Sequence, residues 1–190
     1  MEMSSVLAFA GFSFQILSLA IWVGGLIFFA FVAAPLAFKE IPSRSTAGNF
    51  TAACLRRFQN VEVPCALLAL CGAGFLYVAP VASPVLWSDI ALSVIMFINF
   101  MIYSGYLMPR LEALRLQMSE TDLYAREVDP VVAQTFQQLH SWYARLMTAN
   151  IVLGVVLLIV VSVLCMLCGR AEPGVGTETM MWGGAFNPWQ

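Results

Sequence analysis

Two cysteines near the end of the last apolar stretch have a spacing that could support metal or redox chemistry. Cys165 and Cys168 form a Cys-x-x-Cys pair one helical turn apart, and Met180 and Met181 add sulfur close by in the sequence. Soft sulfur ligands suit Cu(I), and two neighbouring thiols can form a disulfide. A c-type haem motif is excluded, because Gly169 stands where that motif has His. Cysteine is more often a small buried apolar residue, so we expect packing, with a disulfide and a metal site as the alternatives.

The chain contains one histidine, His140. A single imidazole excludes most zinc sites and bis-imidazole haem sites within this chain. We expect His140 to be an interfacial residue close to Trp142. The alternative is one axial haem ligand, which would need a second ligand from another chain. No Ser-His-Asp arrangement, catalytic carboxylate pair or Gly-rich phosphate loop stands out in the sequence, so we predict no cofactor and no enzymatic activity.

The composition indicates where these residues must be held. Of the 190 residues, 61% are hydrophobic and 11% are charged, whereas a soluble domain averages ~45–50% apolar and ~25% charged residues. This composition excludes two classes of protein, a cytosolic enzyme and a disordered tail. The net charge of −2 lacks the basic footprint of a nucleic-acid binder. The solvent for most of this surface is a lipid bilayer.

Four segments are long and apolar enough to cross a membrane, since a spanning helix needs ~20 apolar residues. They cover about residues 12–38, 62–79, 89–108 and 146–168. Pro35 is expected to kink or end the first span, and Gly169 to end the fourth. The sequence therefore predicts an all-α integral membrane four-helix bundle over residues 1–168, followed by a Gly-rich and aromatic tail over residues 169–190.

The cations predict the orientation. Eight of the nine Lys and Arg residues lie in the loops at 39–60 and 109–145, and Arg170 is the remaining one. The positive-inside rule places both loops in the cytoplasm and both termini outside. We therefore expect a multi-pass protein of the bacterial inner membrane with periplasmic termini and cytoplasmic helical extensions.

Both loops are expected to contain helix. In the first loop, apolar residues recur at helical spacing while Arg56 and Arg57 occupy other faces, as in an interfacial helix whose arginines contact lipid headgroups. A helix packed on the end of the bundle is the alternative. In the second loop, Asp129 and Pro130 look like the N-cap and first position of one helix that runs through Cys168.

Polar residues inside the spans are the first place to look for a membrane function. We expect no charged residue in the middle of any span, which argues against a proton relay or an ion-coupled transporter. Gln15, Asn99 and Asn150 are expected to form hydrogen bonds between helices, with a substrate site as the alternative. Small residues at four-residue spacing favour close helix packing, within the bundle or against another subunit; these pairs are Ala20 with Gly24, Ala30 with Ala34, and Ala69 with Ala73.

The tail contains three large aromatic residues, Trp182, Phe186 and Trp189. Aromatic anchors are typical of the centres of protein interfaces, and Trp also settles into lipid headgroups. We expect these three residues to contact a protein partner, with lipid contact as the alternative.

The run from Trp22 to Phe38 (WVGGLIFFAFVAAPLAF), followed by Ile41-Pro42-Ser43-Arg44 and Ala47-Gly48, resembles a family of bacterial four-helix membrane proteins of unknown function. That family is related to a eukaryotic transmembrane protein associated with platinum-drug resistance. Asn99, Pro109-Arg110-Leu111 and Asn150 extend the resemblance to about residues 12–165. The family tends to have a His where this chain has Tyr143, and His140 lies a turn earlier.

The Trp-x-Gly-Gly element is also similar to copper-resistance protein D, a family rich in intramembrane His and Met. Taken together, the residues and resemblances predict a non-catalytic multi-pass membrane protein. We expect a structural or accessory subunit that packs in a larger membrane complex through its helices and tail. The alternative is a small transporter or a metal- or drug-tolerance protein.

Overall fold

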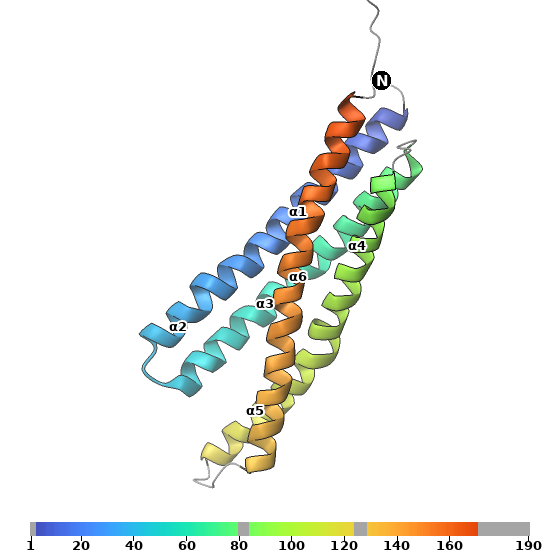
Figure 1. Ribbon diagram of the computed structural model, residues 1–190. Helices are drawn as coiled ribbons and strands as arrows, with labels where there is room; N and C mark the ends of the chain where they lie inside the picture. Colours follow the sequence, from blue (N-terminus) through green and yellow to red (C-terminus); the bar gives the residue numbers. More distant parts are fainter. Residues whose placement is uncertain (1–2, 80–83, 124–128, 171–190) are drawn as a thin grey trace, which may run out of the picture.

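The computed structural model describes residues 3–79, 84–123 and 129–170, and within these ranges the chain is helical with no strand (Figure 1). Long apolar runs without turn residues favour such continuous helices. In chain order the elements are α1 (Met3–Phe28), the π-helix η1 (Phe29–Ala33), α2 (Ala34–Glu40), α3 (Arg44–Val78), α4 (Pro84–Phe100), the π-helix η2 (Met101–Leu107), α5 (Met108–Leu123) and α6 (Pro130–Arg170).

Four continuous helical stretches are long and apolar enough to cross a membrane, which confirms the predicted all-α four-helix architecture. They run over Met3–Glu40, Arg44–Val78, Pro84–Met118 and Pro130–Cys168. Their outer faces carry large apolar side chains, such as Phe9 and Phe31, which are 72% and 73% exposed. Exposed apolar faces on every spanning helix suit contact with acyl chains.

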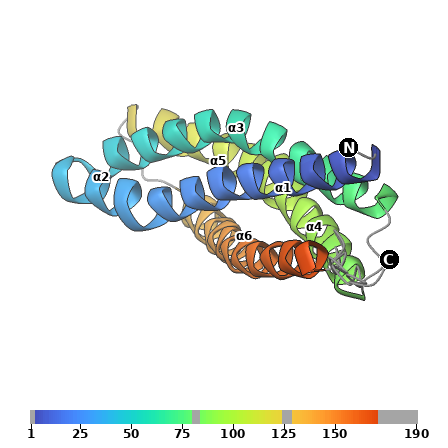
Figure 2. The same cartoon turned by 90° about the horizontal axis from the view of Figure 1, so that it is seen from above.

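The four stretches form two antiparallel hairpins. In the first, α1 and α2 lie against α3, and in the second, α4, η2 and α5 lie against α6. Viewed from above, α1 and α3 lie side by side, with α4 and α6 against them (Figure 2). The start of α1 and the end of α6 lie at one end of the bundle (Figure 1). We call the opposite end, where α2 turns into α3 and where α5 and the start of α6 lie, the basic end, because Lys39, Arg44 and Arg115 are there.

Two prolines are accommodated within the helices without ending them. Pro35 and Pro109 are each the second residue of an α-helix that directly follows a π-helix. Proline lacks an N–H and its ring clashes with the carbonyl four residues earlier, and a wider π-turn relieves that clash. The first and third spans therefore continue as helix past these prolines, to Glu40 and Leu123.

The helices are longer than the spans predicted from the sequence. The segment expected as a separate interfacial or end-packed helix is the first part of α3, which continues without a break through Pro64. α4 begins at Pro84, five residues before the start predicted for that span. The last helix begins at Pro130 as predicted, and the Asp129 carboxylate accepts a hydrogen bond from the Val131 N–H at 2.9 Å.

A close approach of backbones holds the first hairpin together. A Cβ added at Gly72 of α3 would lie 2.8 Å from the Gly11 carbonyl oxygen of α1. Because real Cβ atoms do not come that close, glycine is required for α1 and α3 to pack at this distance. On the outer side of the same helix, Gly74 has no atom within 4 Å of such a Cβ.

Candidate functional site

A buried carboxyl group lies at the centre of the bundle. Glu62 is near the midpoint of α3 and is 0% exposed. Its Oε1 accepts a hydrogen bond from Trp22 Nε1 of α1 at 2.9 Å and another from the Tyr103 hydroxyl of η2 at 2.6 Å. Its Oε2 has no hydrogen-bond partner among the described residues. The expectation that no charged residue type lies in the middle of a span is therefore wrong.

The Glu62 cluster continues into the second hairpin. The Tyr103 ring packs edge-on against Phe100 and against Tyr143 of α6, with centroid distances of 5.5 and 5.7 Å. Asn150 of α6 points its Nδ2 at the Tyr103 hydroxyl at 3.5 Å. Hydrogen bonds, aromatic edges and burial thus connect all four spanning helices at one level of the bundle.

Asn99 and Asn150 join α4 to α6. Asn99 Nδ2 donates to Asn150 Oδ1 at 3.1 Å and to the Leu146 carbonyl at 2.9 Å. Gln15 lies in a different group, where its Nε2 donates to Asp89 Oδ1 at 2.8 Å and to Ser93 Oγ at 3.2 Å. Asp89 is also 0% exposed, so the structure places a second buried carboxyl between α1 and α4.

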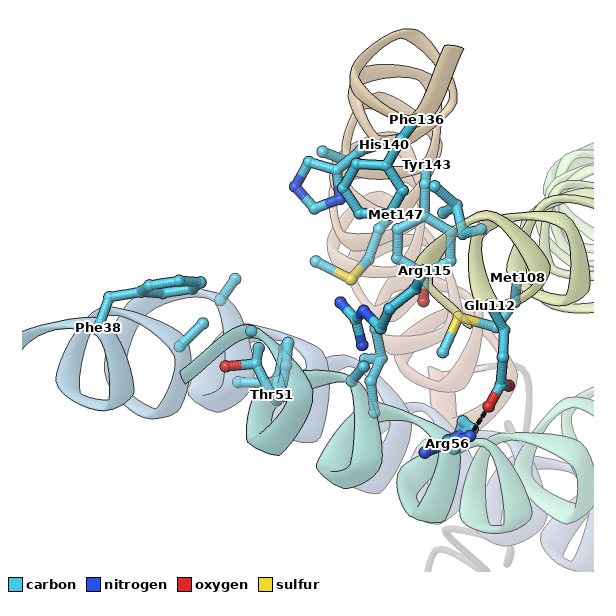
Figure 3. A pocket seen from close by; sticks show the side chains of 18 of the residues that line it. Phe38, Thr51, Arg56, Met108, Glu112, Arg115, Phe136, His140, Tyr143 and Met147 are labelled. Carbon is cyan, nitrogen blue, oxygen red and sulfur yellow. Dashed lines mark ion pairs between the residues drawn. The ribbon is translucent and has the colours of Figure 1, made fainter. Parts of the chain in front are cut away.

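A cavity of about 360 Å³ separates the two hairpins between the Glu62 cluster and the basic end (Figure 3). Figure 1 shows the hairpins diverging toward this end. The walls of the cavity are mostly apolar and come from both hairpins; they include Phe29, Phe38, Leu55, Met108, Leu111, Phe136, Tyr143, Ala144 and Met147. Binding sites for small molecules commonly have volumes of ~300–1,000 Å³ and apolar walls with a few polar groups.

The polar groups of the cavity are few and distinct. Arg56 of α3 forms an ion pair with Glu112 of α5, which neutralises both charges. Arg115 of α5 extends toward α3, where Figure 3 shows its guanidinium within the cavity. Tyr143 is 3% exposed and its hydroxyl has no hydrogen-bond partner among the described residues. A buried hydroxyl without a partner costs free energy, so Tyr143 is the group here that most needs a ligand.

A second, more open hollow of about 600 Å³ adjoins the cavity at the basic end. The two share Phe38, Gly48, Arg115, Phe136 and His140 as lining residues. The lining found only in the outer hollow is mainly polar, namely Arg44, Ser45, Asn49, Met118 and Gln137. An apolar inner chamber thus leads into a polar outer one.

The other residues singled out in the sequence are dispersed. His140 lines the cavity and stacks on Phe136 with ring centroids 5.9 Å apart. Arg57 is exposed on α3. Cys165 and Cys168 are free thiols at the opposite end of α6, and the described residues contain no cluster of three His, Cys, Asp or Glu residues that could hold a metal ion. The aromatic tail residues Trp182, Phe186 and Trp189 lie outside the described residues.

Glu62 and Asp89 are the first residues of the spans predicted at about 62–79 and 89–108, so neither carboxyl was expected inside the bundle. A signal for Glu62 was present, since Trp22 and Tyr103 lie in apolar runs and each has a polar atom that needs a buried acceptor. What periodicity could not supply is the pairing, which joins residues 40 and 41 positions apart.

The fold and the site define a four-helix, multi-pass membrane protein built from two hairpins around a buried carboxyl cluster. The chain belongs to the family described as a domain of unknown function, DUF4149, whose model matches residues 17–120. The match includes Trp22, Glu62, Tyr103 and Arg115, and it ends before α6. No curated protein and no solved structure matches the chain. Membership of a family of unknown function is therefore confirmed, and the relationships to platinum- and copper-resistance proteins stay predictions.

Proposed function

We propose that this protein is a non-catalytic membrane protein that holds a small molecule with a large apolar part in the cavity between its hairpins. The observation that carries this proposal is Tyr143, whose buried hydroxyl has no partner and which lines the cavity. A packed structural core normally satisfies such a group. A ligand with one polar acceptor would satisfy it here.

The position of the cavity supports a role in handling a ligand. The cavity wall combines η1, α2 and α3 of one hairpin with α5 and α6 of the other. Any change in the separation of the hairpins would open or close it. One aromatic ring, Tyr143, separates the cavity from Tyr103, which donates to Glu62. This arrangement fits a transporter or tolerance protein better than it fits a purely structural subunit. The main argument against a transporter was the expected absence of charged residue types inside the spans, and the buried carboxyls remove that argument.

The accessory-subunit role is the second candidate, and one surface favours it. Ala20 and Gly24 of α1 are exposed, and nothing lies within 4 Å of a Cβ built at Gly24. On the adjacent face, Gly25 is packed against the Phe58 ring. An outward pair of small residues suits the close approach of a helix from another chain. The aromatic tail would add to such an interface.

One purification tests both candidates. The full chain is isolated from native membranes in mild detergent and examined by native mass spectrometry. We expect a bound molecule of small mass on the wild type, its loss in Ala144→Trp, which fills the cavity, and its retention in Ala149→Trp, which points outward on the same helix. If all three proteins carry the same bound mass, the cavity is not the site.

The accessory role has its own result in this experiment. It is supported if protein subunits co-migrate with the wild type at fixed stoichiometry and are released by Ala20→Trp. It is contradicted if the wild type migrates without other proteins.

A further inference from the structure

We propose that the cavity and the adjoining hollow form a site for one anionic phospholipid, with the lipid phosphate at Arg115 and an acyl chain in the inner cavity. This inference rests on the proposed function and names the chemical class of its ligand.

Arg115 is the group that both chambers share and that carries a charge available to a ligand. It lines the inner cavity and the outer hollow, and its side chain is partly buried. The other arginine of the cavity, Arg56, is already paired with Glu112. Gly48 of α3 leaves room next to Arg115, because a Cβ there would lie 4.0 Å from Nη2 of the guanidinium. The structure thus presents a partly desolvated guanidinium with space beside it.

The outer hollow has a cation on two of its walls, Arg44 on α3 and Arg115 on α5. Among the described residues that line it, none is Asp or Glu, and His140 adds an imidazole. Ser45, Asn49 and Gln137 add neutral hydrogen-bonding groups. Arginine binds phosphate strongly because its planar fork can donate two parallel hydrogen bonds. This chamber is complementary to an anionic headgroup.

The inner cavity is complementary to an acyl chain. Its walls include Phe29, Leu55, Met108, Leu111 and Met147, all of which are apolar. A soluble phosphate compound would leave this apolar chamber without an occupant. Tyr143 supplies the one hydroxyl of the inner wall that has no partner among the described residues, and it can donate to an ester carbonyl of a lipid.

The depth of the site matches the headgroup region. The Arg110 guanidinium of α5 lies 4.0 Å from the ring centroid of Tyr106 in η2, and that of Arg145 lies 5.3 Å from the Trp142 ring within α6. Both pairs are next in the chain to residues that line the cavity, Met108 and Ala144. Aromatic residues with nearby cations are typical of the membrane interface. Basic pockets between spanning helices at the positively charged side bind anionic headgroups. A lipid of this leaflet would present its phosphate at the height of Arg115.

Lipid binding to the purified full chain tests the proposal. The protein is delipidated in detergent and titrated with phosphatidylglycerol or phosphatidylcholine of the same acyl chains, and the first bound lipid is counted by native mass spectrometry. We expect the wild type to bind phosphatidylglycerol about fivefold more tightly, as ~1 kcal/mol from one arginine implies. In Arg115→Gln the ratio of the affinities for phosphatidylglycerol and phosphatidylcholine should fall to near one. Arg145→Gln, which removes a cation from the outer, lipid-facing surface, should leave it intact.

A second variant protects the test against misfolding of Arg115→Gln. Gly48→Leu keeps every charge and fills the space beside the guanidinium, so it should also abolish the preference. Thermal unfolding of each variant shows whether it is folded.

The outcomes separate the two proposals. Equal affinity for both lipids, with binding lost in Ala144→Trp, would overturn the anionic class and leave the ligand-binding cavity standing. Lipid binding that Ala144→Trp does not change would overturn both. Equal stabilisation by glycerol 3-phosphate and by phosphatidylglycerol would assign the site to a soluble phosphate compound and overturn the lipid.

Discussion

The Trp22 indole N–H of α1 donates a hydrogen bond of 2.9 Å to the Glu62 carboxyl of α3, across the first hairpin. Trp22 is 1% exposed and Glu62 is 0% exposed, so neither group has water as an alternative partner. Tyr103 brings a second donor from the other hairpin to the same oxygen. One carboxyl oxygen therefore holds three helical elements, and Tyr143 connects them to the cavity.

Replacing Glu62 tests how strongly this acceptor stabilises the bundle. In Glu62→Leu the Trp22 N–H and the Tyr103 O–H both lose their acceptor, so we expect a loss of about 2 kcal/mol or more in the free energy of unfolding. Glu62→Gln keeps a carbonyl acceptor of the same shape and should cost about 1 kcal/mol or less. Thermal unfolding in detergent measures both. Glu112→Gln, at the exposed ion pair with Arg56, is the matched control and should change little. If Glu62→Leu and Glu62→Gln lower the free energy of unfolding equally, the hydrogen bonds to this carboxyl do not stabilise the packing of the helices.

Two glycines on one helix give a packing test with an internal control. Gly72→Leu would place a side chain against the backbone of Gly11, so we expect the unfolding free energy to fall by about 2 kcal/mol or more, or the chain not to fold. Gly74→Leu adds the same side chain where no atom lies within 4 Å and should be tolerated. Thermal unfolding and the yield of monodisperse protein report the difference. If both variants behave alike, the close approach of α1 and α3 is not required.

The orientation in the membrane is predicted from the cations. Because the α2–α3 turn and the α5–α6 connection lie in the cation-rich segments, we expect both at the cytoplasmic side and both termini at the periplasmic side. Epitope tags at each terminus should be accessible in intact spheroplasts. A tag between α5 and α6 should become accessible only after permeabilisation. The reverse pattern would invert the topology and place the proposed lipid site in the outer leaflet.

The cysteine pair predicts an absence of tightly bound metal in the isolated chain. Cys165 and Cys168 supply two sulfurs, and a tight site needs a fuller set of ligands with matching geometry. Elemental analysis of the purified protein should show well under one copper or zinc per chain. About one copper per chain, lost in a Cys165→Ser and Cys168→Ser double variant, would instead show a metal site at that end of α6.

The sequence by itself determined the number, type and approximate position of the helices. Apolar runs of the length of a bilayer have one stable backbone conformation there, because every N–H and C=O must be paired within the segment. The start of α6 at Pro130 also follows from local chemistry, since Asp129 caps the helix within its own first turn. The uneven distribution of cations predicts the orientation from local sequence as well, because the positive charge of each loop favours the cytoplasmic side for that loop.

The tertiary structure alone decided which polar residues meet. Asn99 and Asn150 were both expected to bond between helices, but their pairing across 51 positions depends on the rotation and register of α4 and α6. Periodicity assigns a residue to a face of its helix and leaves the facing helix open. Glu62 shows the consequence most clearly. A carboxylate in an apolar run marks a membrane boundary when it is alone, and it becomes a buried centre only because Trp22 and Tyr103 arrive from other helices with donors at the same depth.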